Sequence, residues 1–143
     1  MFKKKARGTE LKWVPIQGEQ IGMVPPHLLE QVKPRDWDVS RFYKLAALLK
    51  SSPFNVMGIF TDKLGAVQGF MWGSINPLDE KFHVHILSVD ETYQGKGIIG
   101  EARGIINRVK KEANLKSTVF STIYPEKFER WGFKRSQLIL MEE

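Results

Sequence analysis

The sequence predicts a single α/β domain, residues 1–143, with a mixed central sheet flanked by helices in the order β-α-α-β-β-β-α-β-α-β. Three observations support this fold class. A glycine-rich turn joins an apolar strand pattern at residues 81–89 to a strongly periodic helix pattern at residues 98–113. Two further strand patterns, residues 54–60 and 66–75, are joined by a five-residue loop that ends in glycine, which is typical of a β-hairpin. Helical patterns precede this hairpin and also follow the glycine turn.

The composition is that of an ordinary globular protein and excludes several kinds of site. There is no cysteine, so a disulfide framework, a thiolate metal site and a cysteine nucleophile are all ruled out. The apolar runs are far too short to span a membrane, and the N-terminus lacks the apolar core of a signal peptide. We therefore expect a cytoplasmic protein without a membrane partner.

The net charge of +6 favours anionic partners, among which nucleic acid and phosphorylated cofactors are the obvious classes. Much of the excess charge lies in residues 1–9, which we expect to form a loose basic terminus. Phe2 is the only aromatic residue there, whereas RNA-binding segments interleave aromatic with basic side chains. A nucleic-acid partner is therefore not expected, and that interpretation rests on charge alone.

The first part of the chain is predicted to form an edge strand and two helices. Residues 11–16 alternate apolar and polar side chains, and Pro15 places this strand at an edge of the sheet. Residues 18–23 are expected to be a loop, and residues 25–32 a short helix with proline in its first turn. Asp36 or Asp38 then caps a second helix that extends to about residue 50. Its apolar residues, at helical spacing, are Phe42, Leu45, Ala46 and Leu49.

The strands at residues 66–75 and 81–89 carry the most specific signals in the sheet. Gly69 and Gly73 interrupt the first of them and indicate a bulge or a close backbone approach. In the second, strict alternation places Phe82, Val84 and Ile86 on one face. The same alternation predicts that the other face carries Lys81, His83, His85, Leu87 and Val89.

The helix predicted over residues 98–113 has one apolar stripe and, opposite it, a basic face. Beyond it we predict a strand at residues 117–122, a short helix at residues 124–131 closed by Gly132, and a last strand at residues 137–141. The apolar stripe consists of Ile98, Ala102, Ile105, Ile106, Val109 and Ala113.

The glycine turn, residues 95–100, has the spacing G-x-G-x-x-G between a strand and a helix, which suits an anion. As a dinucleotide fingerprint it lacks the acidic residue expected about 20 residues further on, since residues 115–122 contain none. A P-loop is excluded because Gly97, rather than serine or threonine, follows Lys96.

The segment from Val89 to Ile98, Val-Asp-Glu-Thr-Tyr-Gln-Gly-Lys-Gly-Ile, resembles the acetyl-CoA-binding segment of the GCN5-related N-acetyltransferases (GNAT family). The signature of that family is Gln/Arg-x-x-Gly-x-Gly/Ala. Residues 128–134, which contain the pair Gly132-Phe133, resemble the family's later helix, and Gln68-Gly69-Phe70 fits its third strand. The predicted order of elements is also the family's order, so the resemblance covers nearly the whole chain.

The resemblance implies an acetyl-CoA-dependent N-acetyltransferase whose partners are acyl-CoA and an amine-bearing small molecule or protein. The turn would bind the pyrophosphate of coenzyme A, and the end of the preceding strand would hold the pantetheine and the thioester. The residues implied in cofactor binding are Leu87, Ser88, Val89, Gln94, Gly95, Lys96, Gly97, Ile98, Ile99 and Gly100. No metal is implied.

Catalysis by direct attack of the amine requires a base for the amine proton and an acid for the departing thiolate. His83 lies six residues before Val89, where some family members carry a catalytic glutamate, and His85 is a second candidate base. Both histidines could instead simply fill a half-exposed strand face. Tyr124 is the candidate acid, although a tyrosine in such a place is more often a packing aromatic.

Two departures from the family pattern leave a second class of function open. Ile99 stands where the signature has its second glycine or alanine, and Phe128 stands where a tyrosine commonly acts as the acid. The alternative is a non-catalytic protein of the same fold, binding or structural, that has lost cofactor binding or chemistry.

Overall fold

The computed structural model describes residues 11–32, 37–49, 55–93, 98–122, 125–136 and 141–143. The basic terminus, residues 94–97 of the glycine turn, Tyr124 and residues 137–140 lie outside the described residues. The elements are β1 Lys12–Pro15, η2 Gly18–Met23, α1 Pro26–Glu30, α2 Val39–Ala46, β2 Asn55–Thr61, β3 Val67–Asn76, β4 Lys81–Val89, η3 Glu91–Tyr93, α3 Ile98–Ala113, β5 Ser117–Phe120 and α4 Pro125–Arg130.

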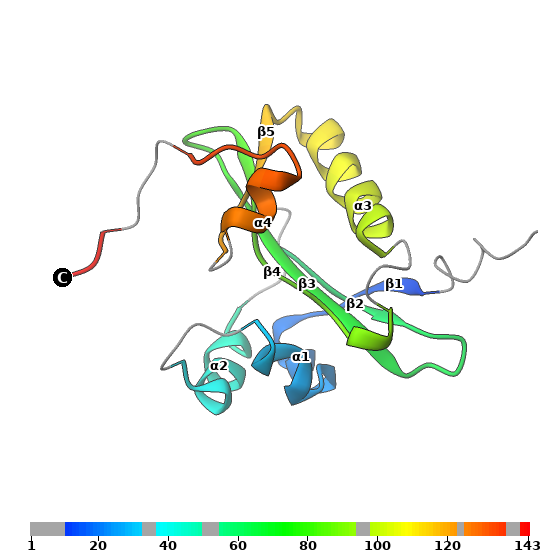
Figure 1. Ribbon diagram of the computed structural model, residues 1–143. Coiled ribbons are helices and arrows are strands. Elements are labelled where there is room, and N and C mark those ends of the chain that lie inside the picture. Colours follow the sequence, from blue (N-terminus) through cyan, green and yellow to red (C-terminus); the bar gives the residue numbers. More distant parts are fainter. Residues whose placement is uncertain (1–10, 33–36, 50–54, 94–97, 123–124, 137–140) are drawn as a thin grey trace, which may run out of the picture.

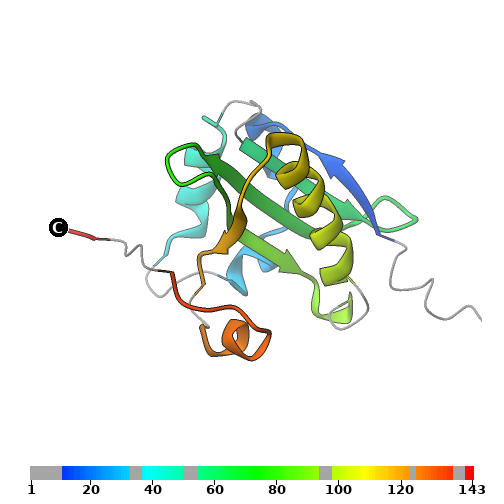
Figure 2. The ribbon, with the colours of Figure 1, turned by 90° about the horizontal axis from the view of Figure 1, so that it is seen from above.

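Within the described residues the sheet has five strands in the order β1-β2-β3-β4-β5, antiparallel except for the parallel pair β4 and β5, and the predicted last strand at residues 137–141 lies almost wholly outside them. The predicted mixed sheet is thereby confirmed, and so is the edge position of β1, which contains Pro15. Helix α3 lies on one face of the sheet, and α1 and α2 lie on the other (Figures 1 and 2). We call these the α3 face and the α1/α2 face. No helix among the described residues is long and apolar enough to span a membrane.

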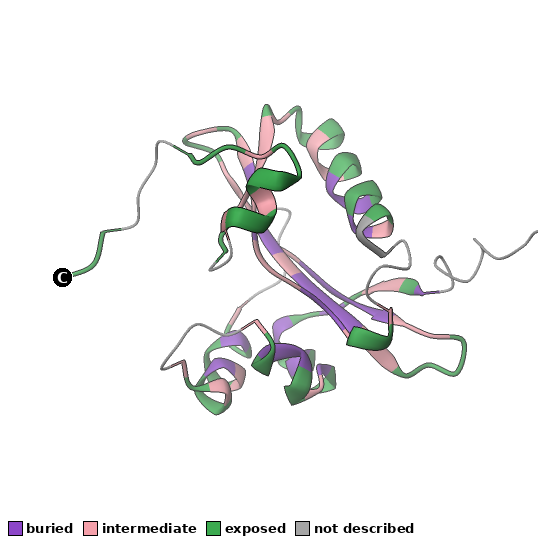
Figure 3. Ribbon diagram, in the orientation of Figure 1, coloured by how far each residue is buried: buried purple, intermediate pink, exposed green. Residues whose placement is uncertain are grey.

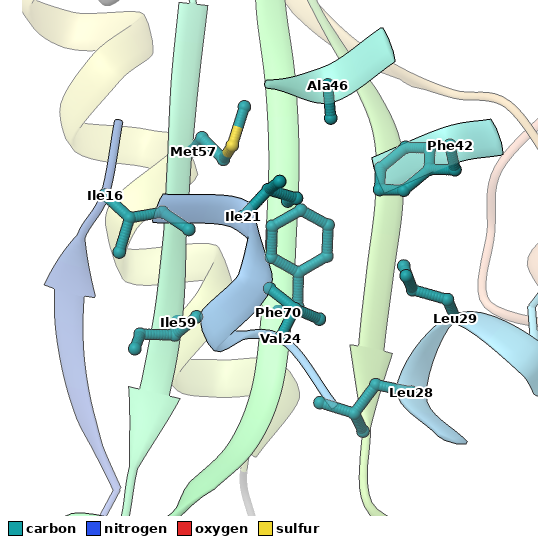
Figure 4. Packing of buried hydrophobic residues seen from close by; sticks show 10 residues of the cluster. All are labelled: Ile16, Ile21, Val24, Leu28, Leu29, Phe42, Ala46, Met57, Ile59 and Phe70. Carbon is teal, nitrogen blue, oxygen red and sulfur yellow. The ribbon is translucent and has the colours of Figure 1, made fainter. Parts of the chain in front are cut away.

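Each face of the sheet has its own apolar core, and the buried residues gather on the strands and on the inner sides of the helices (Figure 3). On the α3 face the buried cluster is Leu11, Phe60, Met71, Phe82, Val84, Val89, Ala102, Ile105 and Ile106. On the α1/α2 face it is Ile16, Ile21, Val24, Leu28, Leu29, Phe42, Ala46, Met57, Ile59 and Phe70 (Figure 4). The strands therefore contribute alternate residues to two separate cores.

Four local predictions are corrected by the structure. Residues 18–23 form a 3₁₀ helix rather than a loop, because Gln17 and Gln20 cap it reciprocally and Gly18 packs directly on the end of α2. Helix α2, capped by Asp38 as predicted, ends at Ala46, where i→i−3 bonds tighten its last turn. Leu45 lies at the margin of the apolar stripe and is 52% exposed. On α3, Ala113 is exposed because the helix extends past the edge of the core.

Candidate active site

Strand β4 extends well beyond its parallel neighbour β5. The two strands pair from Lys81 with Ser117 to Val84 with Phe120, and the amide of Ser121 donates to the carbonyl of Val84 at 3.1 Å. Strand β5 then ends at Phe120, whereas β4 continues to Val89. Along residues 85–89, the edge of β4 that faces away from β3 is therefore not covered by β5. Such an edge suits an extended ligand that forms main-chain hydrogen bonds.

The uncovered part of β4 begins with a β-bulge at His85. Trp72 of β3 is paired with Ile86, and the next residue, Gly73, is paired with Val84, so His85 is an extra residue on β4. A Cβ atom on Gly73 would lie 2.5 Å from Cζ of Phe82 and 2.8 Å from the carbonyl oxygen of His83. Only glycine permits this close approach. The bulge or close approach that Gly73 indicated in the sequence is therefore confirmed.

The bulge makes the predicted alternation of β4 wrong beyond His85. Before the bulge, Phe82 and Val84 belong to the core of the α3 face, and after it Leu87 and Val89 pack on that same core. Ile86 instead packs on the core of the α1/α2 face. The extra residue reverses the sense of alternation, because a strand's side chains have a period of two. Leu87 and Val89 therefore do not share a face with the two histidines.

His83 and His85 do lie on one face, as predicted, with their ring centroids 6.4 Å apart. His85 packs on Trp72, with the ring centroids 4.4 Å apart, and its Nε2 lies 2.8 Å from Oγ of Ser74. Burial lowers the pKa of His85, and the neighbouring charge of His83 lowers it further. The His85 ring is consequently neutral at pH 7 and can accept a proton.

The structure adds one residue to this cluster that sequence reasoning missed. Nε2 of His83 lies 3.1 Å from Oδ2 of Asp79, and both side chains are largely buried. Asp79 lies in the turn between β3 and β4, where Glu80 adopts a positive φ of 59°. Asp79 lies before β4 begins and His83 lies within it, so no single helix or strand pattern in the sequence connected the two side chains. Among the described residues, Nε1 of Trp72 and Oδ1 of Asp79 are buried without a hydrogen-bond partner.

The end of β4 is fastened to α1 by a group of hydrogen bonds. Oγ of Ser88 donates to the carbonyl of Leu28 at 2.6 Å. The side-chain Nε2 of Gln31 donates to Oγ of Ser88 at 2.8 Å and to the carbonyl of Val89 at 2.7 Å. Ser88 is only 2% exposed, so its hydroxyl is engaged within the protein. The hydroxyl of Ser88 is therefore not available to a cofactor, and the predicted cofactor contacts at residues 87–89 stay predictions.

Asp90, the first residue after β4, joins α1 to η3. Its Oδ1 lies 2.8 Å from Nε2 of His27, and its Oδ2 accepts bonds from the amide and the hydroxyl of Thr92. The hydrogen bond from the Thr92 hydroxyl is the main cause of the lowered pKa of Asp90. These hydrogen bonds hold the chain in place where it leaves β4.

Some of the remaining predicted site residues lie outside the described part of the chain, and others lie within it. Residues 94–97 and Tyr124 lie outside the described residues, as do the side chains of Ile98 and Ile99. Helix α3 begins at Ile98, as predicted, and Gly100 in its first turn has open space where a Cβ would lie. The described residues contain no cluster that could hold a metal ion.

Phe128, which stands at the position of the family's usual acid, packs in an aromatic cluster. Its ring packs on Phe120 of β5 at 5.0 Å, on Trp131 at 5.3 Å and on Phe133 at 5.5 Å, measured between centroids. This aromatic cluster fastens α4 to the end of β5.

A separate shallow hollow of about 170 Å³ lies near β1 and β2, lined by Trp13, Gly18, Met57 and their neighbours. It is separated from β4 by β3 and contains none of the predicted residues.

No protein-family model and no curated protein matches this sequence. Solved structures do match the fold. One is a possible acetyltransferase from Clostridium difficile 630, with a TM-score of 0.66, 13% identity and coverage of 93% of this chain and 96% of that one. A second is AAC(6')-Iy in complex with the bisubstrate analogue CoA-S-monomethyl-acetylneamine, with a TM-score of 0.65, 12% identity and coverage of 93% and 97%.

A third is glucosamine-6-phosphate N-acetyltransferase from Arabidopsis thaliana, with a TM-score of 0.60, 13% identity and coverage of 93% of this chain and 97% of that one. The likeness extends over nearly the full length of each chain, with the same mixed sheet and flanking helices. At these identities it establishes architecture and not activity. The chain has the fold of the GCN5-related N-acetyltransferases.

Proposed function

We propose that this protein transfers an acetyl group from acetyl-CoA to a primary amine. The observation that carries the proposal is the uncovered edge of β4 at residues 85–89, which leads through the glycine turn directly to the N-terminus of the 16-residue helix α3. The first N–H groups of a helix and its dipole favour a pyrophosphate at that point. Apart from the carbonyl of Val89, which accepts a bond from Gln31, the strand edge would supply main-chain donors and acceptors for the two amide groups of the pantetheine arm.

The lengths of the arm and the strand agree. Between the pyrophosphate and the sulfur, pantetheine is about as long as four residues of extended chain, roughly 14 Å. Four residues of strand, from Val89 back to His85, rise about 13 Å. An arm that starts beside Val89 and lies along β4 would therefore bring its thioester to the bulge at His85. His83 lies just beyond that point on the same strand.

The proposed reaction is direct attack of the amine nitrogen on the thioester carbon. A C–N bond forms, the C–S bond breaks, and the amine proton passes to a base. His83 is the proposed base, and His85, which is neutral at pH 7, is the second candidate. Tyr124 is the proposed acid that protonates the departing thiolate, because Phe128 cannot donate a proton and is held in the aromatic cluster. A cytoplasmic location stays a prediction.

The acceptor is proposed only as a class, an amine-bearing small molecule or protein. One structural neighbour is a glucosamine-6-phosphate N-acetyltransferase, and another is described as an aminoglycoside acetyltransferase. Both act on amines, which supports a primary amine as the acceptor here.

The second candidate is a protein of this fold that performs no chemistry, and Phe128 at the usual acid position favours it. Binding and turnover of acetyl-CoA separate the two candidates. Acetyl-CoA at 100 times its dissociation constant should stabilise the protein by about 2.7 kcal/mol, measured as a rise in melting temperature. Free thiol released in the presence of neamine, glucosamine 6-phosphate or a blocked lysine peptide then reports transfer. Binding without thiol release would favour the non-catalytic candidate, and absence of binding at millimolar acetyl-CoA would exclude the enzyme.

A matched pair of variants tests where the pyrophosphate binds. Gly100 and Gly104 both lie on α3 with open space at the Cβ position. Gly100→Asp places a negative charge in the first turn, where it suits the helix but repels a pyrophosphate. We expect it to weaken acetyl-CoA binding at least tenfold without lowering the melting temperature of the free protein. Gly104→Asp, one turn further on, should bind acetyl-CoA nearly as the parent does, and equal affinities for the two variants would place the pyrophosphate elsewhere.

A further inference from the structure

The pairing of His83 with Asp79 determines which ring nitrogen of His83 is free. Oδ2 of Asp79 lies 3.1 Å from Nε2 of His83. An ionised carboxylate only accepts hydrogen bonds, so the neutral ring must carry its hydrogen on Nε2. The lone pair of neutral His83 is then on Nδ1. The side chains are 21% and 16% exposed respectively, so the contact is sheltered from water without being sealed from a substrate.

Among the described residues, His83 is the one hydrogen-bond partner of the Asp79 side chain. Oδ1 of Asp79 is buried and has no hydrogen-bond partner among the described residues. The neighbouring acid, Glu80, points elsewhere and pairs with Lys116 at 3.5 Å. In the described part of the chain, the titratable and charged groups that bear on the His83 ring are Asp79 from the turn, His85 from β4 at 6.4 Å between ring centroids, and Lys81, which alternation places on the same strand face.

We propose that Asp79 is a positioning residue for His83 in acetyl transfer, and this rests on the proposed function. Asp79 holds the ring in the tautomer that leaves Nδ1 free to take the amine proton. It also places a negative charge next to the imidazolium ion that forms when the proton arrives. In the step itself the amine nitrogen bonds to the thioester carbon, its proton moves to Nδ1 of His83, and coenzyme A leaves as the thiolate. Asp79 neither gains nor loses a proton.

The first test is a measurement on the unaltered protein that does not depend on turnover. Nitrogen-15 NMR of the His83 imidazole at pH 8 should show a protonated Nε2 and an unprotonated Nδ1. In Asp79→Asn, whose amide can donate to Nε2, the population with hydrogen on Nδ1 should rise. A parent protein with its hydrogen on Nδ1 would overturn the proposal, and so would a tautomer unaffected by Asp79→Asn.

The second test is kinetic and uses Glu80→Gln as the matched control, since it removes a negative charge from the same turn. With acetyl-CoA and whichever probe amine is acetylated, Asp79→Asn should lower kcat by about tenfold to a hundredfold, which is part of the roughly 10²- to 10⁴-fold that general acid–base catalysis supplies. Its KM for acetyl-CoA should be unchanged, and the acid limb of its pH–rate profile should move to lower pH. Glu80→Gln should match the parent in all three.

The outcomes separate this proposal from the proposed function. If no probe amine is acetylated, the proposed function fails, whereas the NMR result still decides whether Asp79 fixes the His83 tautomer. If transfer occurs and Asp79→Asn has the kcat and the pH profile of Glu80→Gln, acetyl transfer stands and the role of Asp79 is refuted. A drop in kcat without a change in the pH profile would indicate a purely structural residue and would also refute it.

Discussion

Removing the Ser88 hydroxyl should loosen the attachment of α1 to β4 by a predictable amount. Ser88→Ala deletes the bond donated to the carbonyl of Leu28 at 2.6 Å and the bond accepted from Gln31 at 2.8 Å. Both Ser88 and Leu28 are buried, so water does not readily replace the lost donor. At about 0.5–1.5 kcal/mol for each bond, the expected loss of folding free energy is about 1–3 kcal/mol. This corresponds to a melting temperature lower by several degrees for a chain of this size.

A double-mutant cycle with Gln31→Ala measures the hydrogen bond between Gln31 and Ser88 separately from the other bonds. Gln31 also donates to the carbonyl of Val89, so each single variant loses bonds that the other keeps. The coupling free energy isolates the Gln31–Ser88 bond and should be about 0.5–1.5 kcal/mol from urea unfolding curves. Additive effects within experimental error would contradict the geometry at the end of β4. Acetyl-CoA affinity measured on the same variants then shows whether fastening α1 to this strand matters for the proposed ligand.

Two further predictions follow from packing and from charge. Gly18→Ala should destabilise the fold by about 1–3 kcal/mol, because its Cβ would lie 2.2 Å from the carbonyl oxygen of Leu49 and something must move. Gly22→Ala in the same 3₁₀ helix has open space and should unfold at nearly the parent's urea concentration; equal losses would disprove the close contact. The lowered pKa of His85 means that the unfolded chain binds more protons just below pH 6.5, so stability should fall as the pH drops through that value. His85→Gln should flatten the stability profile between pH 8 and pH 5, and an unchanged slope would assign the dependence to another group.

The parts of the fold that could be predicted are those set by local pattern. The bounds of β4 and α3 agree with the sequence prediction, because a long alternating run and a long helical stripe each leave little choice of period. The edge position of β1 followed from Pro15, which cannot join a ladder on both sides. The end of α2 was misplaced because its final turn tightens against η2, a tertiary contact that its own periodicity does not reveal.

The candidate site was harder to predict, because its geometry depends on pairs that are distant or unusually spaced. Gln31 and Ser88 are 57 residues apart, and neither belongs to a motif. Asp79 and His83 are close in sequence but meet only because the chain turns at Glu80. The position of the β-bulge could likewise not be predicted from the sequence. Gly73 on β3 indicated an irregularity, but only the pairing register shows that the extra residue is His85 on β4.

The excess positive charge of the chain lies outside the described residues. The chain carries 22 basic and 16 acidic residues, of which 8 and 2 lie in segments 1–10, 33–36, 50–54 and 94–97, outside the described part. The described residues therefore hold 14 of each sign, and their net charge is zero. A general basic surface that would attract nucleic acid is thus not a property of the described fold. Lys96 belongs to the excess and lies two residues before the start of α3 in the sequence. In the proposed function its charge would add to the positive end of the helix dipole, so the proposal of a pyrophosphate there needs no general basic surface.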